Sequence, residues 1–411
     1  MSNRLLSWPA AHGALAALSL SVLLSSLGTS MANVSLPSLT RAFGASFQQA
    51  QWVVLSYLLA MTAVVVVAGR MGDRLGRRRL LLTGLLLFTL ASVFCARSPS
   101  LEALIAARAV QGLGAATMMA LAMALVADTV PRERTGSVMG WLASMSAVGT
   151  ALGPSAGGLL IAWLDWRAMF LSMVPLGVLA LWLTRRHLPD TPLPHAAGRG
   201  APAADAALWR DATLWPALLM NALVATVMMA TLVIGPFFLS GGLGLDTVWV
   251  GAAMSVGPAM SMAFGFVAGR LVDRWGAACA LRSGLLSMLA GALGLVLLPG
   301  PWGLAGYLVA IAILTPGYQL FQAANNTATL GRLPAARRGE VSGLLNLARN
   351  LGLMAGASLM GWVFAWVTRE PASAAPASLL HGVQVTFGVA AGLLVLSMRI
   401  GRPPRPAGSG F

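Results

Sequence analysis

Long apolar runs, each about as long as a membrane is thick, constrain the fold of this chain more than any other feature. A helix needs roughly 20 apolar residues to cross the hydrocarbon core of a bilayer. The runs are continuous rather than alternating, which excludes a transmembrane β-barrel. They cover residues 12–34, 50–69, 80–96, 101–127, 136–163, 168–184, 213–239, 247–269, 278–298, 303–329, 341–367 and 379–398. We therefore predict an all-α membrane protein with twelve transmembrane helices.

The composition excludes a water-soluble enzyme. Charged residues make up 9% of the chain and apolar residues 57%, whereas a soluble domain carries about 25% charged residues. A membrane-embedded enzyme stays a remote alternative, because it would need His, Asp or Cys ligands clustered at one membrane depth. Cys95 and Cys279 are far apart in the sequence and build neither a disulfide framework nor a metal cluster. We expect no catalytic residues, no metal and no cofactor.

The distribution of arginine predicts the topology. All 27 basic residues are arginine, and most fall on one side of the predicted helices, whereas Arg41, Arg97, Arg167 and Arg369 fall on the other. Cytoplasmic loops carry the excess of basic residues, so we expect a multi-pass protein of the cell inner membrane with both termini in the cytoplasm. A nucleic-acid surface would combine arginines with exposed aromatic residues on polar stretches. The sequence has no such stretch, so we expect no nucleic-acid partner.

An internal repeat divides the chain into two halves. The segment GRMGDRLG at Gly69–Gly76 returns 200 residues later as GRLVDRWG at Gly269–Gly276. Each copy follows the second predicted helix of its half, and two six-helix bundles around a central cavity are a transporter architecture. We predict an N-terminal bundle at 1–184, a cytoplasmic linker at 185–211, a C-terminal bundle at 212–400 and a disordered tail at 401–411.

The loop between the second and third predicted helices contains more than membrane anchors. Anchoring explains its arginines but neither Asp73 nor the glycines, which return in the second copy of the repeat. A carboxylate here can pair with the arginines or cap a neighbouring helix. The residues Gly69, Asp73, Arg74, Gly76, Arg77 and Arg78 resemble the loop 2–3 signature of the major facilitator superfamily.

Further blocks extend the resemblance over nearly the whole chain. RAVQGLGAA at Arg108–Ala116 is similar to the family's Arg-x-x-Gln-Gly block, and GTALGPSAGG at Gly149–Gly158 resembles the helix 5 signature of its drug:proton antiporters. DWRAMFLSMVP at Asp165–Pro175 and SGLLNLARNLG at Ser342–Gly352 also resemble that group. The resemblance implies an exporter that works by alternating access.

The resemblance also implies a conformational switch. In the family, the Asp and Arg of loop 2–3 hold the outward-facing state by pairing across the two halves. Asp73, Arg74 and Arg77 match those positions, and Asp128 and Glu340 are candidate partners at the predicted cytoplasmic ends of helices 4 and 11. The alternative is that these residues are surface charges without a switching role.

The fifth predicted helix has the pattern of a close helix contact. Gly149, Gly153 and Gly157 recur every four residues and share one face, which permits close approach of another backbone. Pro154 removes one backbone hydrogen bond and permits a kink. Together with Gly158, these residues predict a tight, bendable contact, and in a transporter the same contact can seal the cavity in one state.

Arg108 is the most informative charge inside a predicted helix. It lies about 10 Å from the outer end of helix 4 at 1.5 Å per residue, and an ionisable group at such depth usually faces a wet cavity. Gln111 is one turn further on and can hydrogen-bond it, so we predict a buried charge with a coupling role. The alternative is an arginine that snorkels to the outer headgroups. Arg349 in helix 11 lies closer to the cytoplasmic side, where snorkelling is equally plausible.

Polar residues within the other helices are candidates for the cavity wall. In the family, helices 1, 4, 7 and 10 line the cavity, and each polar residue could equally form a helix–helix hydrogen bond. The candidates are Thr29, Asn33, Asn221, Thr226, Tyr318, Gln319, Gln322 and Asn325. Methionines suit a pliable apolar wall that accepts several substrates, and the candidates here are Met118, Met119, Met123, Met228 and Met229.

One position departs from the family pattern. Its drug:proton antiporters often carry an Asp in helix 1, where the matching stretch LGTSMANVSLP at Leu27–Pro37 has Gly28. We place all twelve acidic residues in loops or at helix ends, so proton coupling follows from the resemblance alone. With Arg108 as the clearest buried charge, we predict a preference for neutral or anionic amphiphiles over permanent cations.

These observations predict a secondary transporter that exports small amphiphilic compounds and draws on the proton gradient. The alternative is a facilitator or importer of a defined polar or anionic metabolite. The expected partners are a small-molecule substrate, protons and the lipid bilayer, and we expect a monomer. A receptor is disfavoured because the chain has no sizeable soluble domain for a signalling output.

Overall fold

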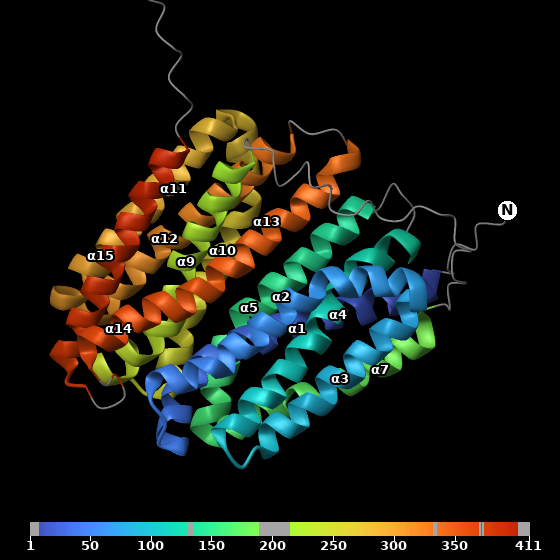
Figure 1. Ribbon diagram of the computed structural model, residues 1–411, viewed down its shortest axis with the longest axis horizontal. Coiled ribbons are helices and arrows are strands. Elements are labelled where there is room, and N and C mark those ends of the chain that lie inside the picture. Colours follow the sequence, from blue (N-terminus) through green and yellow to red (C-terminus); the bar gives the residue numbers. More distant parts are fainter. Residues whose placement is uncertain are drawn as a thin grey trace, which may run out of the picture.

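The computed structural model describes residues 8–129, 135–188, 214–331, 335–369, 371 and 374–401, and these residues form helices and no strand (Figure 1). The N-terminal half consists of α1 (Trp8–Phe43), α2 (Phe47–Leu75), α3 (Arg77–Arg97), α4 (Leu101–Thr129), α5 (Thr135–Trp163), α6 (Trp166–Leu171) and α7 (Met173–His187). The last two are separated only by Ser172 and together make one crossing, Trp166–His187.

The C-terminal half repeats this order with two interruptions of regular helix. It consists of α9 (Trp215–Phe237), α10 (Thr247–Trp275), α11 (Ala277–Leu297), α12 (Pro299–Leu330), α13 (Ala335–Ala355), α14 (Gly361–Thr368) and α15 (Pro376–Ile400). A π-helical turn, η2 (Phe238–Gly242), extends α9, and a second one, η3 (Gly356–Met360), joins α13 to α14. Both halves therefore contain six crossings, which is the predicted fold class.

Length and composition support the membrane crossings. Eleven of the described helical segments are long and apolar enough to cross a membrane. The remaining one is α2, whose sequence from Val53 to Ala68 contains no charged residue. Several helices continue beyond the apolar runs, as α1 does to Phe43. A helix can extend past the hydrocarbon with polar residues, because its backbone hydrogen bonds do not depend on the side chains.

The predicted linker and tail lie mostly outside the described residues. Helix α7 continues to His187, so three residues of the predicted linker at 185–211 are helical. Residues 189–213 and 402–411 are not among those described, and the remaining domain boundaries stay predictions.

The internal repeat extends beyond the motif to whole helices. Helices α2 and α10 begin and end 200 residues apart, and so do α3 and α11. In each half a single glycine joins the two helices, Gly76 with φ 92° and Gly276 with φ 76°. Positive φ is strained for residues with a Cβ atom, so this tight connection explains why the glycine is present in both copies.

The two halves lie side by side, the N-terminal half coloured blue to green and the C-terminal half yellow-green to red in Figure 1. They contact through α5 with α10, α2 with α13, and α1 with α9. We call the end of the molecule with the connections 43–47, 163–166 and 242–247 the sealed end, and the end with 75–77 and 275–277 the arginine-rich end.

Contacts between the halves gather at the sealed end. The ring of Phe47, at the start of α2, lies 4.8 Å from that of Phe237 and 5.9 Å from that of Phe364, centroid to centroid. Nearby, the Gln51 Nε2 group donates to the carbonyl oxygen of Ala357 at 2.9 Å and is buried. Apolar rings and a satisfied buried amide thus close this end of the space between the halves.

Candidate functional site

A cavity of about 580 Å³ lies between the two halves. Helices α4 and α5 of the N-terminal half and α9, α10, α12 and α13 of the C-terminal half line it. Its volume falls in the range of small-molecule sites, about 300–1,000 Å³. A space of this size at the bundle interface, closed at one end by the Phe47 contacts, can enclose a small organic molecule.

The two walls of the cavity differ in chemistry. The N-terminal half contributes methionine, alanine and short hydroxyl side chains, namely Met119, Met123, Ser146, Ala147 and Thr150. The C-terminal half contributes the amides, the phenols and the charge, and its polar lining residues are Asn221, Thr231, Ser261, Tyr307, Thr315, Tyr318, Gln319, Gln322, Asn326, Ser342, Asn346 and Arg349. The cavity is thus amphipathic, with its hydrogen-bonding groups concentrated on one side.

Arg349 is the charged side chain among the described lining residues. Its Nε group donates to Tyr318 Oη at 3.1 Å, and Gln322 Nε2 donates to the same oxygen at 2.9 Å. Arg349 is about 21 Å along α13 from its first residue, at 1.5 Å per residue. That depth favours a charge facing the cavity over one that snorkels to the headgroups.

Arg108 does not line this cavity. It is fully buried inside the N-terminal bundle, where Nε donates to the Val53 carbonyl at 3.0 Å and an Nη group donates to Gln111 Oε1 at 2.6 Å. Its guanidinium carbon lies 4.2 Å from the centroid of the Tyr57 ring, a cation–π distance. The hydrogen bond to Gln111 expected from the sequence is present, but the wet-cavity location is wrong in this conformation.

Gln111 extends the Arg108 cluster to a third helix. Its Nε2 group donates to Ser92 Oγ of α3 at 2.8 Å, and Met173 Sδ of α7 lies at 3.8 Å. The second guanidinium nitrogen, Nη2, is buried and has no hydrogen-bond partner among the described residues. The cluster ties α2, α3 and α4 together, which gives Arg108 a structural role in this conformation.

Gly28, where related antiporters often carry Asp, belongs to the same region of the N-terminal bundle. A Cβ atom on Gly28 would lie 3.1 Å from Tyr57 Oη and 3.3 Å from the Phe88 ring. Tyr57 stacks on Arg108, so the missing carboxylate position is next to the Arg108 cluster rather than in the large cavity.

The predicted helix 5 motif makes two different contacts. Gly149 and Gly153 face α1, where Ser30 Oγ donates to the Gly149 carbonyl at 3.1 Å, and Gly157 faces Met31. Gly158 instead faces α10 of the other half, since a Cβ there would lie 2.6 Å from the Thr247 carbonyl. The close approach was predicted. In the structure, part of the motif contacts α1 within the N-terminal half and Gly158 contacts α10 of the other half.

The contact between α5 and α10 uses small residues on both helices. A Cβ on Gly251 would overlap the carbonyl oxygen of Pro154, and the backbone N–H of Ser155 donates to Ser255 Oγ at 3.0 Å. Backbones approach this closely only where side chains are small. The helix 5 motif therefore brings α5 against α10 of the other half in this conformation.

The predicted switch is only partly described. The surroundings of Gly69 and the side chains of Asp73, Arg74, Asp128 and Glu340 are outside the described part of the structure, although α2 continues through Asp73 to Leu75. The segment predicted as a loop between the apolar runs 50–69 and 80–96 is helical except at Gly76, because α2 ends at Leu75 and α3 begins at Arg77. Two arginines of this segment bind backbone carbonyls of neighbouring helices: Arg77 Nη1 donates to Ala124 at 3.2 Å and Arg78 Nη2 to Arg185 at 2.6 Å. These bonds hold the start of α3 against α4 and α7.

Four of the eight predicted wall residues line the cavity: Asn221, Tyr318, Gln319 and Gln322. Of the other four, Thr226 and Asn325 make helix–helix hydrogen bonds, the alternative that the sequence left open, and Thr29 and Asn33 bond within their own helix. Thr226 Oγ1 donates to the Gly352 carbonyl at 3.0 Å and Asn325 Nδ2 to the Ala217 carbonyl at 3.3 Å. Within α1, Thr29 and Asn33 donate to the carbonyls of Ser25 and Thr29 at 3.2 and 3.1 Å.

Sequence reasoning underestimated the contribution of α13. Ser342, Leu345, Arg349 and Leu353 all line the cavity, and their spacing of three or four residues places them on one helix face. This spacing was present in the Ser342–Gly352 block. Of the predicted methionines, Met119, Met123 and Met228 line the cavity, whereas Met118 and Met229 are buried in the core.

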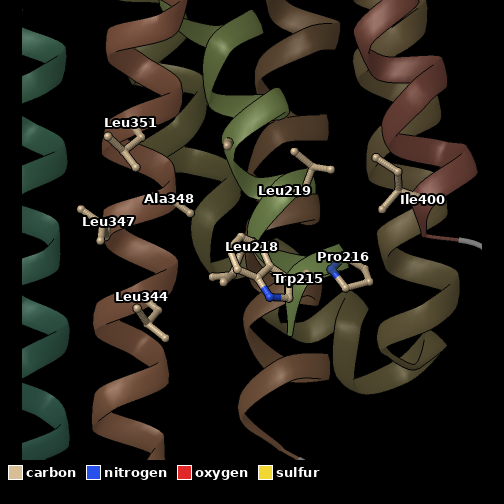
Figure 2. Close-up of a pocket in the computed structure, with 10 residues that line it drawn as sticks. Trp215, Pro216, Leu218, Leu219, Leu344, Leu347, Ala348, Leu351 and Ile400 are labelled. Carbon is tan, nitrogen blue, oxygen red and sulfur yellow. The ribbon is translucent and has the colours of Figure 1, made fainter. Parts of the chain in front are cut away.

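A second hollow lies on the C-terminal bundle between α9, α13 and α15 (Figure 2). Figure 2 shows Leu344, Leu347 and Leu351 along α13, with Leu219 of α9 across the groove and Ile400 of α15 at its far side. Its volume is about 620 Å³, and all its lining residues are apolar. It offers no charged group to a substrate, so the polar chemistry belongs to the central cavity.

The fold and the central cavity define a polytopic membrane transporter rather than an enzyme. The family model of the Major Facilitator Superfamily matches residues 18–357. The chain belongs to that superfamily.

The names of similar proteins refer to different transport functions. The chain is 29% identical to an uncharacterised transporter, YebQ, of Escherichia coli strain K12, over 86% of this chain and 89% of that one. It is 26% identical to the riboflavin transporter RibZ of Clostridioides difficile strain 630, over 84% and 86%. It is 29% identical to the multidrug resistance protein Stp of Mycobacterium tuberculosis, over 82% and 74%.

Solved structures share the fold at low sequence identity. A bacterial homologue of the human lysosomal transporter Spinster, in an inward-facing and unoccupied conformation, superposes with a TM-score of 0.76 at 19% identity and covers 96% of this chain and 97% of its own. A D-xylose–proton symporter gives a TM-score of 0.78 at 17% identity, with the same coverage.

Proposed function

We propose that this protein exports small amphiphilic compounds across the cell inner membrane by alternating access, with the proton gradient as the energy source. The observation that carries the proposal is the amphipathic cavity between the halves. Its methionine-containing wall suits variable apolar groups, and its polar wall suits a head group. The multidrug resistance protein among the relatives supports efflux.

The proposal includes an orientation and an organisation. The arginine-rich end faces the cytoplasm by the positive-inside rule, which makes the described conformation inward-facing and both termini cytoplasmic. The N-terminal bundle at 1–184 and the C-terminal bundle at 212–400 move as units, joined by the linker at 185–211. The protein works as a monomer, because each copy contains its own cavity.

Closure of the arginine-rich end is assigned to the loop 2–3 residues. Asp73, Arg74 and Arg77 form ion pairs at this end in the outward-facing state, with Glu340 as the partner across the halves and Asp128 as the partner within the N-terminal half. The described lining of the cavity contains no carboxylate, so a proton is carried either by the substrate or by one of these edge carboxylates.

A defined metabolite is the second candidate substrate. The riboflavin transporter among the relatives and the polar wall around Arg349 both favour it. A facilitator would move this metabolite without a pH gradient, whereas an exporter that draws on the gradient requires one.

Uptake into inverted membrane vesicles tests the proposal. Vesicles containing the protein should accumulate a neutral amphiphile, such as N-phenyl-1-naphthylamine, only when a pH gradient is imposed. An ionophore that dissipates the gradient should abolish the uptake. Equal accumulation with and without the gradient would favour the facilitator, and no accumulation of either a neutral or an anionic amphiphile would reject export.

A further inference from the structure

Arg349 is half-buried in the cavity wall and lacks the carboxylate partner that a cation withdrawn from water normally has. Within the described residues, no carboxylate forms an ion pair with it. Of its three guanidinium nitrogens, Nε alone makes a hydrogen bond to the described residues, which it donates to Tyr318 Oη. Its two Nη groups therefore have no protein acceptor among the described residues. A guanidinium presents them as a planar fork that matches the two oxygens of a carboxylate, sulfonate or phosphate.

Tyr318 adds a further donor beside this fork. Its phenolic oxygen accepts hydrogen bonds from Arg349 Nε and from Gln322 Nε2, at 3.1 and 2.9 Å. A phenol has one hydrogen to donate and two lone pairs to accept with. Because both lone pairs are engaged, the Tyr318 hydroxyl hydrogen remains for an acceptor in the cavity. The cluster therefore offers N–H and O–H donors without a competing anion.

The opposite wall positions the rest of such a molecule. Met119 and Met123 of α4 and Ala147 of α5 line the N-terminal side of the same cavity. Apolar surface gains free energy on leaving water in rough proportion to its area. An amphiphile with one oxyanion therefore has a preferred orientation, with its charged group on α12 and α13 and its apolar part against α4 and α5.

We infer that Arg349 and Tyr318 form an oxyanion-binding site, and that this transporter selects amphiphiles with a carboxylate, sulfonate or phosphate group over neutral and cationic ones. The inference deepens the proposed function and rests on it for transport, although binding can be measured separately. A cation in this low-dielectric cavity would be repelled by Arg349. Selectivity thus resides in the C-terminal half, away from the Arg108 cluster.

Two dyes with the same skeleton test the inference directly. N-phenyl-1-naphthylamine is neutral, and 8-anilinonaphthalene-1-sulfonate carries one sulfonate on the same ring system. Their binding is measured by fluorescence on purified protein in nanodiscs, with empty nanodiscs subtracted. We expect Arg349→Gln to weaken sulfonate binding by about tenfold or more and to change neutral-dye binding by less than about twofold.

Further variants separate charge from geometry. Arg349→Lys should keep part of the sulfonate preference, because it retains the charge but loses the fork. Tyr318→Phe should weaken sulfonate binding by about threefold to tenfold. Arg282→Gln removes the same charge from an exposed position on α11 and should change neither dye. Melting curves identify any variant that fails to fold. If Arg349→Gln does not fold, the sulfonate binding of Arg349→Lys and Tyr318→Phe decides whether the inference holds.

Two results would overturn the inference. One is an Arg349→Gln variant that folds and keeps the wild-type ratio of sulfonate to neutral dye. The other is wild-type protein that binds no more sulfonate dye than empty nanodiscs. Failure of the proposed function gives a different result from failure of this inference. If only the proposed function is wrong, the sulfonate dye still binds through Arg349, but the vesicles accumulate neither dye.

Discussion

Arg108 and Arg349 have similar sequence contexts and different environments. Both lie within predicted membrane-spanning helices, and each has a nearby amide or phenol partner. Arg108 is fully enclosed by α2, α3 and α4, whereas Arg349 faces the cavity. The sequence identifies both as costly charges. It does not determine which face of α4 packs inward, because a nearly all-apolar helix has no polar side to orient it, whereas Ser342 and Asn346 of α13 share the cavity face with Arg349.

Removal of Arg108 should affect stability more than specificity. Arg108→Ala leaves Gln111 Oε1 without its donor and opens a cavity between α2 and α4. We expect a loss of about 2–5 kcal/mol in the free energy of unfolding, with little change in the ratio of sulfonate to neutral dye bound. Thermal unfolding in detergent measures the first effect, and the dye pair measures the second.

Arg97→Ala is the matched control for Arg108→Ala. Arg97 is exposed in the last turn of α3, and the Arg97→Ala variant should unfold at the wild-type temperature. If Arg108→Ala melts like wild type but loses anion transport, Arg108 has the coupling role that its sequence position suggested.

At the scale of elements, the sequence predicts the crossings well and their contacts poorly. All twelve apolar runs correspond to helical crossings, because the bilayer requires each run to satisfy its own backbone. The repeat also located the glycine turns at Gly76 and Gly276. The π-helical turns η2 and η3 were not predicted, since they depend on packing between helices. For the same reason, only half of the predicted wall residues line the cavity.

The α5–α10 contact should control the balance between the two states. Gly251→Ala places a methyl group against the Pro154 carbonyl, and backbone cannot rotate away as a side chain can. We expect the sealed end to open and the outward-facing population to increase. Spin labels at Gln48 and Val248, exposed at the starts of α2 and α10, report the distance across this end in a Cys279→Ala background.

Gly265→Ala is the control on the same helix. A Cβ there meets no atom within 4 Å, and replacing a helical glycine by alanine stabilises a helix by about 0.5–1 kcal/mol. The label distance should match that of wild type. An unchanged distance in Gly251→Ala as well would show that the contact tolerates a methyl group without opening.

At the scale of the whole molecule, the two halves are related by the 200-residue repeat but differ in charge. After Gly76 the first copy continues with three arginines, Arg77, Arg78 and Arg79, whereas the second continues after Gly276 with Ala277, Ala278 and Cys279. Polar cavity groups show the opposite bias, since they concentrate in the C-terminal half. The halves therefore differ in chemistry: the N-terminal half carries the run of three arginines, and the C-terminal half carries most of the polar groups of the cavity.

The topology follows from the arginine asymmetry and can be measured directly. Reporter fusions after Ala196 and at the C-terminus should be active in the cytoplasm, and a fusion after Ser98 should be active on the outside. Ser98 follows α3 at the sealed end, where few arginines occur. A periplasmic signal from the Ala196 fusion would reverse the orientation of the molecule.

The same substitution, made separately in each copy of the repeat, should affect transport to different extents. Asp73→Asn should abolish transport without preventing membrane insertion, because insertion depends on the apolar runs. A loop carboxylate that biases closure by about 2–3 kcal/mol shifts a two-state population by about 100-fold. Asp273→Asn, in the copy that has no arginine run after Gly276, should reduce transport far less. The vesicle assay at matched protein levels compares the two, and normal efflux by the Asp73→Asn variant would leave the loop as a membrane anchor only.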